Sequence, residues 1–260
     1  MKFNLNRMMA GLVMISGLLP MTTQAADMNS AQKQQVQGVV HDYIVQNPEV
    51  IVESLQSWQQ KQMMASVQQT QNSSLQYADQ IFHQSNDPVA GNPKGKVTVV
   101  EFFDYQCPHC VEMSPIFDNL VKNNPNVRVV FKEFPIRGPA SEVAARAALA
   151  AAGQGKYLEL HNALMDVAGK APLTEEIIYK TAGKVGLDVD KLKVAMKSSA
   201  INDQIKANYQ LAQNLKLMGT PAIFIAGSNV NAKSPASAIV FIPGQVDADQ
   251  LNKNIQKVSG

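Results

Sequence analysis

The chain has 260 residues, with 23 lysines and arginines, 21 aspartates and glutamates, and a formal net charge of +2 at pH 7. This near balance excludes a global basic field of the kind that draws proteins to nucleic acid or anionic lipid. The length is sufficient for a main domain with a buried core and a smaller second domain.

Residues 1–25 have the pattern of a secretory signal peptide. Lys2 and Arg7 precede the apolar stretch 8–19, and small residues around Ala25 and Ala26 offer a cleavage site. About a dozen apolar residues are too few to span a bilayer, which favours cleavage over a membrane anchor. The sequence therefore predicts export to the periplasm as a soluble product.

Residues 26–76 are predicted to be helical. Ser30 suits the cap of a first helix, and Asn47, Pro48 and Glu49 suit the cap, first position and acidic first turn of a second. Each helix carries apolar residues on one face: Val36, Val39, Val40, Tyr43 and Ile44 in the first, and Ile51, Leu55 and Trp58 in the second.

Two amphipathic helices cannot enclose a core alone, so these faces must pack on the main domain, on each other, or on a second copy of the chain. The glutamine-rich stretch 59–76 is typical of a long stalk helix, which favours the second copy. The sequence therefore predicts a dimerisation segment with a stalk over 26–76, and a homodimer. The alternative is an N-terminal extension folded onto its own domain.

Residues 77–260 are predicted to form an α/β domain. Strand 96–104, helix 107–122 and strand 126–134 make a β-α-β unit. A helical insert follows over about 138–217, and two strands at 221–225 and 239–242 precede a last helix capped by Asp247. The polar loop Gly227–Ser237 joins these two strands, and a surface insertion is favoured over a contact with substrate.

Cys107 and Cys110 are the only cysteines, and they frame Pro108 and His109 directly after an apolar strand. An exported chain with no other cysteine has no structural disulfide, so the pair is available for redox chemistry. Pro108 suits the first helical position, which would place a Cys107 thiolate at the positive end of the helix, with the His109 imidazole nearby. Both influences lower the thiol pKa, and a stabilised thiolate makes the disulfide a stronger oxidant.

Two motifs carry a family resemblance. The run 100–110, Val-Glu-Phe-Phe-Asp-Tyr-Gln-Cys-Pro-His-Cys, and the run 219–225, Gly-Thr-Pro-Ala-Ile-Phe-Ile, flank the helical insert. Residues 80–258 resemble the DsbA family of the thioredoxin superfamily. The resemblance implies a thioredoxin fold with a helical insertion, preceded here by an N-terminal α-helical segment. It also implies a cis peptide bond before Pro221 beside the disulfide, with Thr220 facing the substrate.

The resemblance further implies a buried acidic residue beneath the disulfide, and Glu101 occupies that position. Lys132 on the next strand is a candidate partner, and the pair would pass a proton to or from Cys110. The alternative is that these are strand charges that reach solvent.

The implied activity is that of a thiol-disulfide oxidoreductase that introduces or rearranges disulfides in secreted proteins. DsbA proteins are monomeric oxidases with valine before the cis proline, whereas dimeric disulfide isomerases resemble this chain in having threonine there and an N-terminal dimerisation segment. The balance between oxidase and isomerase therefore stays open. The expected partners are unfolded or misfolded secreted proteins and a membrane redox partner for recycling, with no cofactor beyond the disulfide, no metal and no nucleic acid.

Three alternatives remain. The alternative functions are a disulfide reductase, a metal-handling thioredoxin-like protein, and a non-catalytic chaperone that uses the fold as a scaffold. Zinc needs more ligands than two cysteines, and His41, His83 and His161 show no paired spacing with them, although this reasoning does not exclude copper.

Overall fold

The computed structural model describes residues 28–259, so the predicted signal peptide lies outside the described residues. The chain divides into two compact units, one ending at Ser57 and the other running from Trp58 to the C-terminus. This division falls earlier than the boundary predicted at residue 76 and inside a helix. No helix within 28–259 has both the length and the apolar character needed to cross a membrane.

The first unit is helical, as predicted. Helix α1 spans Ser30–Gln46, and α2, Glu49–Ser74, begins in this unit and continues into the second. Asn29, rather than the predicted Ser30, caps α1, because its side chain accepts a hydrogen bond from the Gln32 amide while its own amide donates to the Gln32 side chain. Helix α1 buries no side chain within the described residues, so its apolar face is left exposed.

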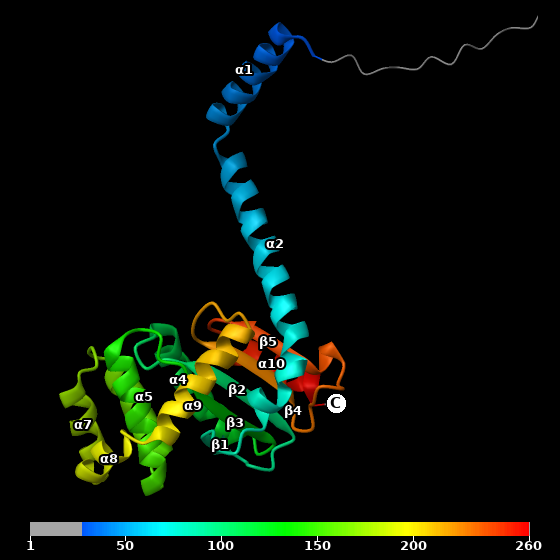
Figure 1. Ribbon diagram of the computed structural model, residues 1–260. Helices are drawn as coiled ribbons and strands as arrows, with labels where there is room; N and C mark the ends of the chain where they lie inside the picture. The colour runs from blue at the N-terminus through cyan, green and yellow to red at the C-terminus, as the bar shows by residue number, and fades with distance from the viewer. Residues whose placement is uncertain (1–27, 260) are drawn as a thin grey trace, which may run out of the picture. The chain divides into compact units, whose positions relative to one another are not determined.

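A five-stranded sheet organises the second unit (Figure 1). Its order is β1-β3-β2-β4-β5, and β2 and β3 are parallel while the other neighbours are antiparallel. The strands are β1 Val89–Gly91, β2 Val97–Phe103, β3 Val127–Glu133, β4 Ala222–Gly227 and β5 Ile239–Pro243. The sequence predicts all of them except the short edge strand β1. Every residue of the central strand β2 is buried, which explains why its residues are apolar apart from Thr98 and Glu101.

Helix α4, Pro108–Asn123, connects β2 to β3 close to its predicted bounds, which confirms the β-α-β unit. The helical insertion between β3 and β4 is also confirmed. It contains α5 Pro139–Ala151, α6 Tyr157–Ala168, α7 Glu175–Lys184, α8 Val189–Ala195 and α9 Ser199–Asn214, whereas α3 Ala78–Phe82 precedes the sheet and α10 Ala248–Val258 follows it.

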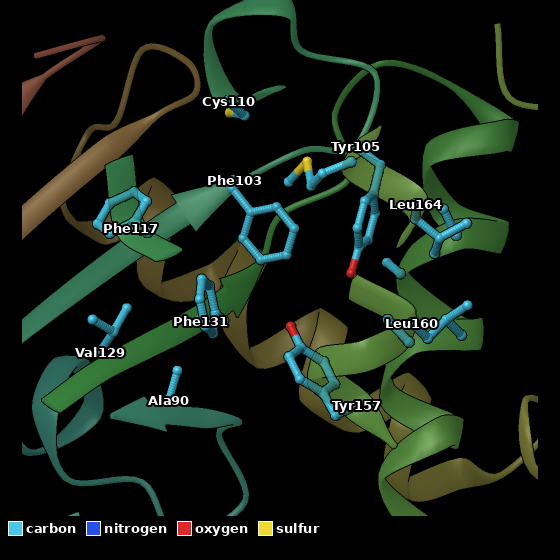
Figure 2. Packing of buried hydrophobic residues seen from close by; sticks show 14 of the residues in the cluster. Ala90, Phe103, Tyr105, Cys110, Phe117, Val129, Phe131, Tyr157, Leu160 and Leu164 are labelled. Atoms are coloured by element: carbon cyan, nitrogen blue, oxygen red, sulfur yellow. The ribbon is translucent and has the colours of Figure 1, made fainter. Parts of the chain in front are cut away.

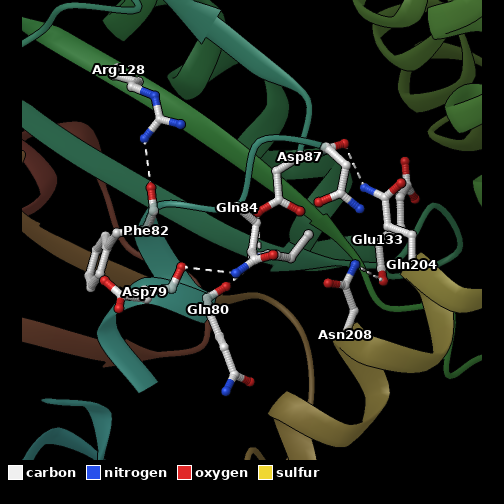
Figure 3. Close-up of polar contacts among 11 residues, drawn as sticks. Asp79, Gln80, Phe82, Gln84, Asp87, Arg128, Glu133, Gln204 and Asn208 are labelled. Atoms are coloured by element: carbon white, nitrogen blue, oxygen red, sulfur yellow. Dashed lines mark hydrogen bonds and ion pairs between the residues drawn. The ribbon is translucent and has the colours of Figure 1, made fainter. Parts of the chain in front are cut away.

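The two faces of the sheet bury separate apolar clusters, because side chains alternate along each strand. Phe103 and Phe131 belong to the face covered by α4, α10 and most of the insertion, and this face also holds both cysteines (Figure 2). Phe102 and Val130 point to the opposite face, which α3 and α9 cover. The Arg128 guanidinium donates to the carbonyl of Phe82 at 2.8 Å, which ties the end of α3 to β3 (Figure 3).

The last turns of α2 belong to the second unit and pack against the rest of it. Thr70 and Ser74 are buried, and the Thr70 hydroxyl donates to the carbonyl of Leu215 at 3.1 Å. Val67 packs against the apolar cluster beneath α3 and α9. The loop Gly227–Ser237 is also partly anchored to the domain. Val230 is buried, and its carbonyl oxygen lies 2.8 Å from Nε2 of the His83 ring.

Candidate active site

Cys107 stands at the N-cap of α4, where β2 ends and the helix begins. Its backbone is extended, with φ −84° and ψ 115°, and Pro108 follows at the start of the helix. Both Cys107 and Cys110 are free thiols and are buried on the sheet face that they share with Phe103. The thiol of Cys107 donates to the carbonyl oxygen of Thr220 at 3.1 Å, which joins the helix start to the loop before β4.

The surroundings of Cys107 favour its thiolate. A hydrogen bond from the Cys110 thiol is the largest influence, and it lowers the pKa of Cys107 to about 5 together with the Thr220 hydroxyl, the Cys110 backbone amide and the charge of Arg137. Burial acts in the opposite direction but is outweighed. Cys107 is therefore ionised at neutral pH, as a nucleophile or a good leaving group must be.

The surroundings of Cys110 favour its thiol. Burial is the main cause, and the hydrogen bond to Cys107 and the charge of Glu101 add to it, so the pKa of Cys110 is raised well above its ordinary value. The two sulfurs therefore differ in protonation, because Cys107 favours the thiolate and Cys110 favours the thiol.

Glu101 is buried on the same face of β2 as Phe103, the face that also holds both cysteines. Burial raises the pKa of its carboxyl well above the ordinary value, and the negative charge of Cys107 raises it further. Its Oε1 atom is buried and has no hydrogen-bond partner among residues 28–259. A carboxyl whose pKa is raised and which interacts electrostatically with both sulfurs is a candidate proton donor.

The predicted pair of Glu101 and Lys132 is wrong. Lys132 ion-pairs with Asp87 at 2.5 Å, with both side chains only 2% exposed, and it also donates to the carbonyl of Gln80 at 2.6 Å. In the register of the parallel strands, Glu101 lies opposite Phe131. Lys132 is the next residue of β3, so its side chain points to the other face of the sheet. Lys132 therefore has no part in the site around the cysteines.

The structure brings Thr220 and Pro221 to Cys107. The Thr220–Pro221 peptide bond is cis, and the Thr220 carbonyl accepts the hydrogen bond from the Cys107 thiol. The Thr220 hydroxyl is buried and has no partner among the described residues while Cys107 is a thiol, although it can donate to the thiolate.

His109 lies on the exposed side of the first turn of α4. Its Nδ1 atom is 2.9 Å from the side-chain oxygen of Gln245 and 3.5 Å from a carboxylate oxygen of Glu112. Pro108 occupies the predicted first helical position. An influence of Pro108 and His109 on the pKa of the Cys107 thiol remains a prediction.

Asp104 is a site residue that sequence reasoning missed. Its carboxylate accepts hydrogen bonds from the Gln106 amide at 2.7 Å, the Ser141 hydroxyl at 2.7 Å and the Arg137 amide at 2.9 Å. It thereby fixes the turn that leads into Cys107 and holds the Arg137 segment against it. An aspartate directly after a strand is a local turn signal, but its bond to Ser141 depends on tertiary packing.

Asp104→Ala is expected to lower the free energy of unfolding of the reduced protein by about 3 kcal/mol, because it leaves one buried and two partly buried donors without their shared acceptor. Urea denaturation followed by circular dichroism measures the loss. The matched control is Asp203→Ala, since Asp203 is exposed, and it should lie within about 0.5 kcal/mol of the unchanged protein. Equal effects of the two substitutions would show that the carboxylate of Asp104 has no structural role.

A second missed feature is a buried network that joins Tyr105, Glu133 on β3, and Tyr157 and His161 on α6. The hydroxyls of Tyr105 and Tyr157 donate to one oxygen of Glu133, at 3.1 and 2.8 Å, and Tyr105 also lies 3.1 Å from Nδ1 of His161. Burial raises the pKa of Glu133 and lowers that of His161 to about 3. Asn208 donates to the backbone carbonyl of Glu133 at 3.0 Å (Figure 3). His161 is therefore a neutral core residue, joined to the sheet that carries the cysteines.

The histidines considered as metal ligands do not gather at the cysteines. His161 belongs to the buried network and the His83 ring bonds the carbonyl of Val230. Within residues 28–259, no three histidine, cysteine, aspartate or glutamate side chains are grouped so that they could hold a metal ion.

A dithiol at a helix start, with one acidic thiol beside a cis proline on this α/β sheet, defines a thiol-disulfide exchange protein of the thioredoxin type. Residues 98–256 match the family described as DSBA-like thioredoxin domain, which covers more than half of the chain. The protein belongs to this family, and the resemblance found in the sequence is confirmed. Residues 32–65 separately match the domain described as Copper resistance protein ScsC N-terminal domain.

Solved structures agree with this assignment. BcfH from Salmonella enterica Typhimurium is 34% identical, with a TM-score of 0.70, and the match covers 88% of this chain and 97% of that one. A thioredoxin-like oxidoreductase from Silicibacter pomeroyi is 39% identical, with a TM-score of 0.61, over 69% of this chain and 95% of that one. The thioredoxin-like fold with an N-terminal helical segment is therefore established.

The curated relatives differ in length. A thiol:disulfide interchange protein DsbA from Bordetella parapertussis is 27% identical over 55% of this chain and 69% of that protein. Na(+)/H(+) antiporter NhaA 3 from Salinispora tropica is 30% identical over 60% of this chain but only 25% of that protein. The chain thus spans about a quarter of the antiporter's length.

Proposed function

We propose that the protein is an exported thiol-disulfide oxidoreductase that introduces or rearranges disulfides in secreted proteins. The observation that carries this proposal is the contrast between the two thiols, with the pKa of Cys107 lowered to about 5 and that of Cys110 raised. Such a pair has one sulfur that attacks or leaves easily and one that resolves the intermediate. The relatives named as thiol:disulfide interchange and oxidoreductase proteins support the same activity.

In the oxidising direction, a client thiolate attacks Cys107 of the Cys107–Cys110 disulfide. The bond between the two enzyme sulfurs breaks, and Cys110 leaves as a thiolate and takes a proton. A second client thiolate then attacks the client sulfur of the mixed disulfide and expels the stabilised thiolate of Cys107. Two electrons pass from the client dithiol to the enzyme, and a membrane redox partner would remove them.

In the rearranging direction, the reduced enzyme starts the reaction. The Cys107 thiolate attacks a wrong client disulfide and forms a mixed disulfide, which releases one client thiolate. Another client thiolate attacks the mixed disulfide and regenerates Cys107, so no electrons are transferred in total. If Cys110 attacks first, the client is reduced instead and the enzyme disulfide forms.

Glu101 is the proposed proton donor for Cys110. Its carboxyl is buried on the same sheet face and its raised pKa favours the protonated form, which would supply the proton that the leaving Cys110 needs. Thr220 and Pro221 are the proposed client-binding residues, because a client sulfur bonded to Cys107 comes to rest beside them.

The function is tested by refolding a reduced, unfolded protein such as ribonuclease with the oxidised enzyme in stoichiometric amount. We expect disulfide formation with the unchanged protein and a loss of at least about 100-fold in rate with Cys107→Ser. Cys107→Ala should behave like Cys107→Ser. If both variants promote refolding as well as the unchanged protein, the protein is a chaperone and the proposal fails.

The exposed apolar face of the first unit supports self-association as the second part of the proposal. Val36, Val39, Val40, Tyr43 and Leu55 are each at least half exposed. Apolar faces of this extent on helices are stable when copies of the chain cover them.

We therefore expect a homodimer of the exported chain in light scattering after gel filtration. Val39→Lys together with Tyr43→Lys should convert it to a monomer, because the two charges would lie in the contact. Replacing exposed polar residues of the same helix instead, Gln34→Lys with Gln37→Lys, is the control. A monomeric unchanged protein would contradict self-association, and a higher oligomer would correct its stoichiometry.

Copper handling is the second candidate function, because residues 32–65 match a domain whose description includes copper resistance. Two thiolates are suitable soft ligands for Cu(I). Anaerobic titration of the reduced protein with Cu(I) separates the candidates. Tight stoichiometric binding without any thiol exchange would displace the proposed activity.

A further inference from the structure

Arg137 is an exposed cation beside the redox site. It lies between the end of β3 at Glu133 and the start of α5 at Pro139. Its guanidinium forms no ion pair with any acidic side chain of residues 28–259. We propose that Arg137 is a specificity-determining residue that favours client segments with carboxylates next to the cysteine that reacts with Cys107.

Two backbone hydrogen bonds to Asp104 place Arg137 next to Cys107. The Cys107 amide donates to the Asp104 carbonyl at 3.0 Å, and the Arg137 amide donates to the Asp104 carboxylate at 2.9 Å. The side chain of Gln106 also donates to the Arg137 carbonyl at 3.2 Å. The pKa of Cys107 is lowered first by the hydrogen bond from Cys110 and also by the charge of Arg137, so the field of this guanidinium reaches the reacting sulfur.

The backbone on both sides of Arg137 is restricted. Pro135 and Pro139 each lie two residues away, and the proline ring fixes φ. Gly138 caps the start of α5 with a φ of 100°, in the region that favours glycine. A cation on a backbone held in this way loses less freedom when it binds a client than one on a mobile chain would.

The acidic groups of this region are engaged with other partners. The Asp104 carboxylate is buried and accepts three hydrogen bonds, all from donors other than a guanidinium. Glu142 pairs with an arginine of its own helix at 2.7 Å, and Glu112 lies 3.5 Å from Nδ1 of His109. The guanidinium of Arg137 is therefore available to a carboxylate of a client.

A guanidinium at this position discriminates between clients by charge. A client bonded through its cysteine to Cys107 brings the neighbouring residues close to Arg137. An extended chain advances about 3.3 Å per residue, so a side chain one or two positions from the client cysteine stays within the Debye length of about 8 Å at physiological ionic strength. Carboxylates there are attracted and ammonium groups are repelled. The inference rests on the proposed function and adds a substrate preference to it.

The test uses the full-length exported chain with Cys110→Ser, so that a mixed disulfide with Cys107 accumulates. Two short peptides with blocked ends carry one cysteine as a disulfide with the uncharged 2-thiopyridyl group, and the cysteine is flanked by glutamates in one peptide and by lysines in the other. The Cys107 thiolate attacks the peptide sulfur, the bond between the peptide and pyridyl sulfurs breaks, and the released thiopyridine takes a proton and is followed by its absorbance.

The quantity measured is the rate with the glutamate peptide divided by the rate with the lysine peptide. The same ratio for 2-mercaptoethanol corrects for the intrinsic reactivity of the two peptides. We expect the corrected ratio to be above one, to fall about threefold with Arg137→Gln and about tenfold with Arg137→Glu, and to be largely kept with Arg137→Lys. Salt at about 1 M, where the Debye length is about 3 Å, should remove most of the preference.

Lys197→Gln is the matched control, because Lys197 is also exposed and also forms no ion pair within the described part of the chain. It removes the same charge from the turn between α8 and α9 and should leave the ratio unchanged. Equal ratios in Arg137→Gln and Lys197→Gln would overturn the inference. So would a preference that is undiminished at high salt, since charge would then not be its cause.

The uncharged disulfide 2,2′-dithiodipyridine separates this inference from the proposed function. Fast reaction with all variants, combined with one ratio for all of them, removes only the role of Arg137. Slow reaction of the protein with Arg137 in place, at the rate of an ordinary cysteine, removes the proposed function itself.

Discussion

Asp87→Ala lowers the free energy of unfolding by about 3–5 kcal/mol, more than the loss expected for Asp104→Ala. The reason is that it leaves the ammonium group of Lys132 buried without its carboxylate, 2.5 Å away in the unchanged protein. Burial already lowers the pKa of Lys132, and the attraction of Asp87 opposes that effect. Without Asp87, we expect Lys132 to lose its proton on folding or to distort the sheet around it.

A double variant separates the effect of losing the ion pair from the effect of losing side-chain volume. Asp87→Ala with Lys132→Met removes both charges and should recover most of the lost stability, because no unpaired charge remains buried. Urea denaturation of the reduced protein at pH 7 measures both variants. If the double variant is as unstable as the sum of two single variants, the charge pair is not the cause. Thiol exchange of the folded double variant should be normal, since Lys132 lies on the far face of the sheet.

Glu101→Gln slows the reaction of the oxidised enzyme with client thiols by about 100-fold, the size expected for loss of a positioned proton donor. The glutamine fills the same space but cannot supply the proton that Cys110 requires as it leaves. Stopped-flow fluorescence with a dithiol peptide measures the rate. Glu112→Gln is the control, because Glu112 is an exposed carboxylate on α4 beside His109 and should have little effect.

The pH dependence of this difference has a defined direction. Glu101 donates only while protonated, and its pKa is raised by burial, so the advantage over Glu101→Gln persists above the ordinary carboxyl range. It is lost as the pH rises through the raised pKa. The ratio of the two rates is the quantity to follow, because the client thiolate fraction changes equally for both proteins. A ratio that does not change with pH would rule out proton donation by Glu101.

The parts of the site that the sequence predicts are those with local causes. Cys107 is placed at the start of a helix by Pro108 and by the apolar run before it, and Cys110 follows within the first turn. Glu101 lies on the cysteine face because it alternates along β2 in step with Phe103.

The parts that the sequence does not predict depend on strand register and distant packing. The partner of Lys132 follows from the register of β2 with β3, and Asp87 comes from a loop before the first strand. The edge strand β1 has three residues and ends at Gly91, which has a positive φ of 77°, so it lacks the length that marks a strand in sequence. The bond between Asp104 and Ser141 joins residues brought together only by folding.

Titration of the Cys107 thiol tests the central claim most directly. The thiolate absorbance of the reduced protein near 240 nm, measured from pH 3 to 9 and corrected with Cys107→Ser, should rise with a midpoint near pH 5. Cys110 should add nothing over this range, because its pKa is raised. A midpoint near 9, the ordinary value for cysteine, would contradict the division of labour between the two sulfurs on which the proposed exchange chemistry depends.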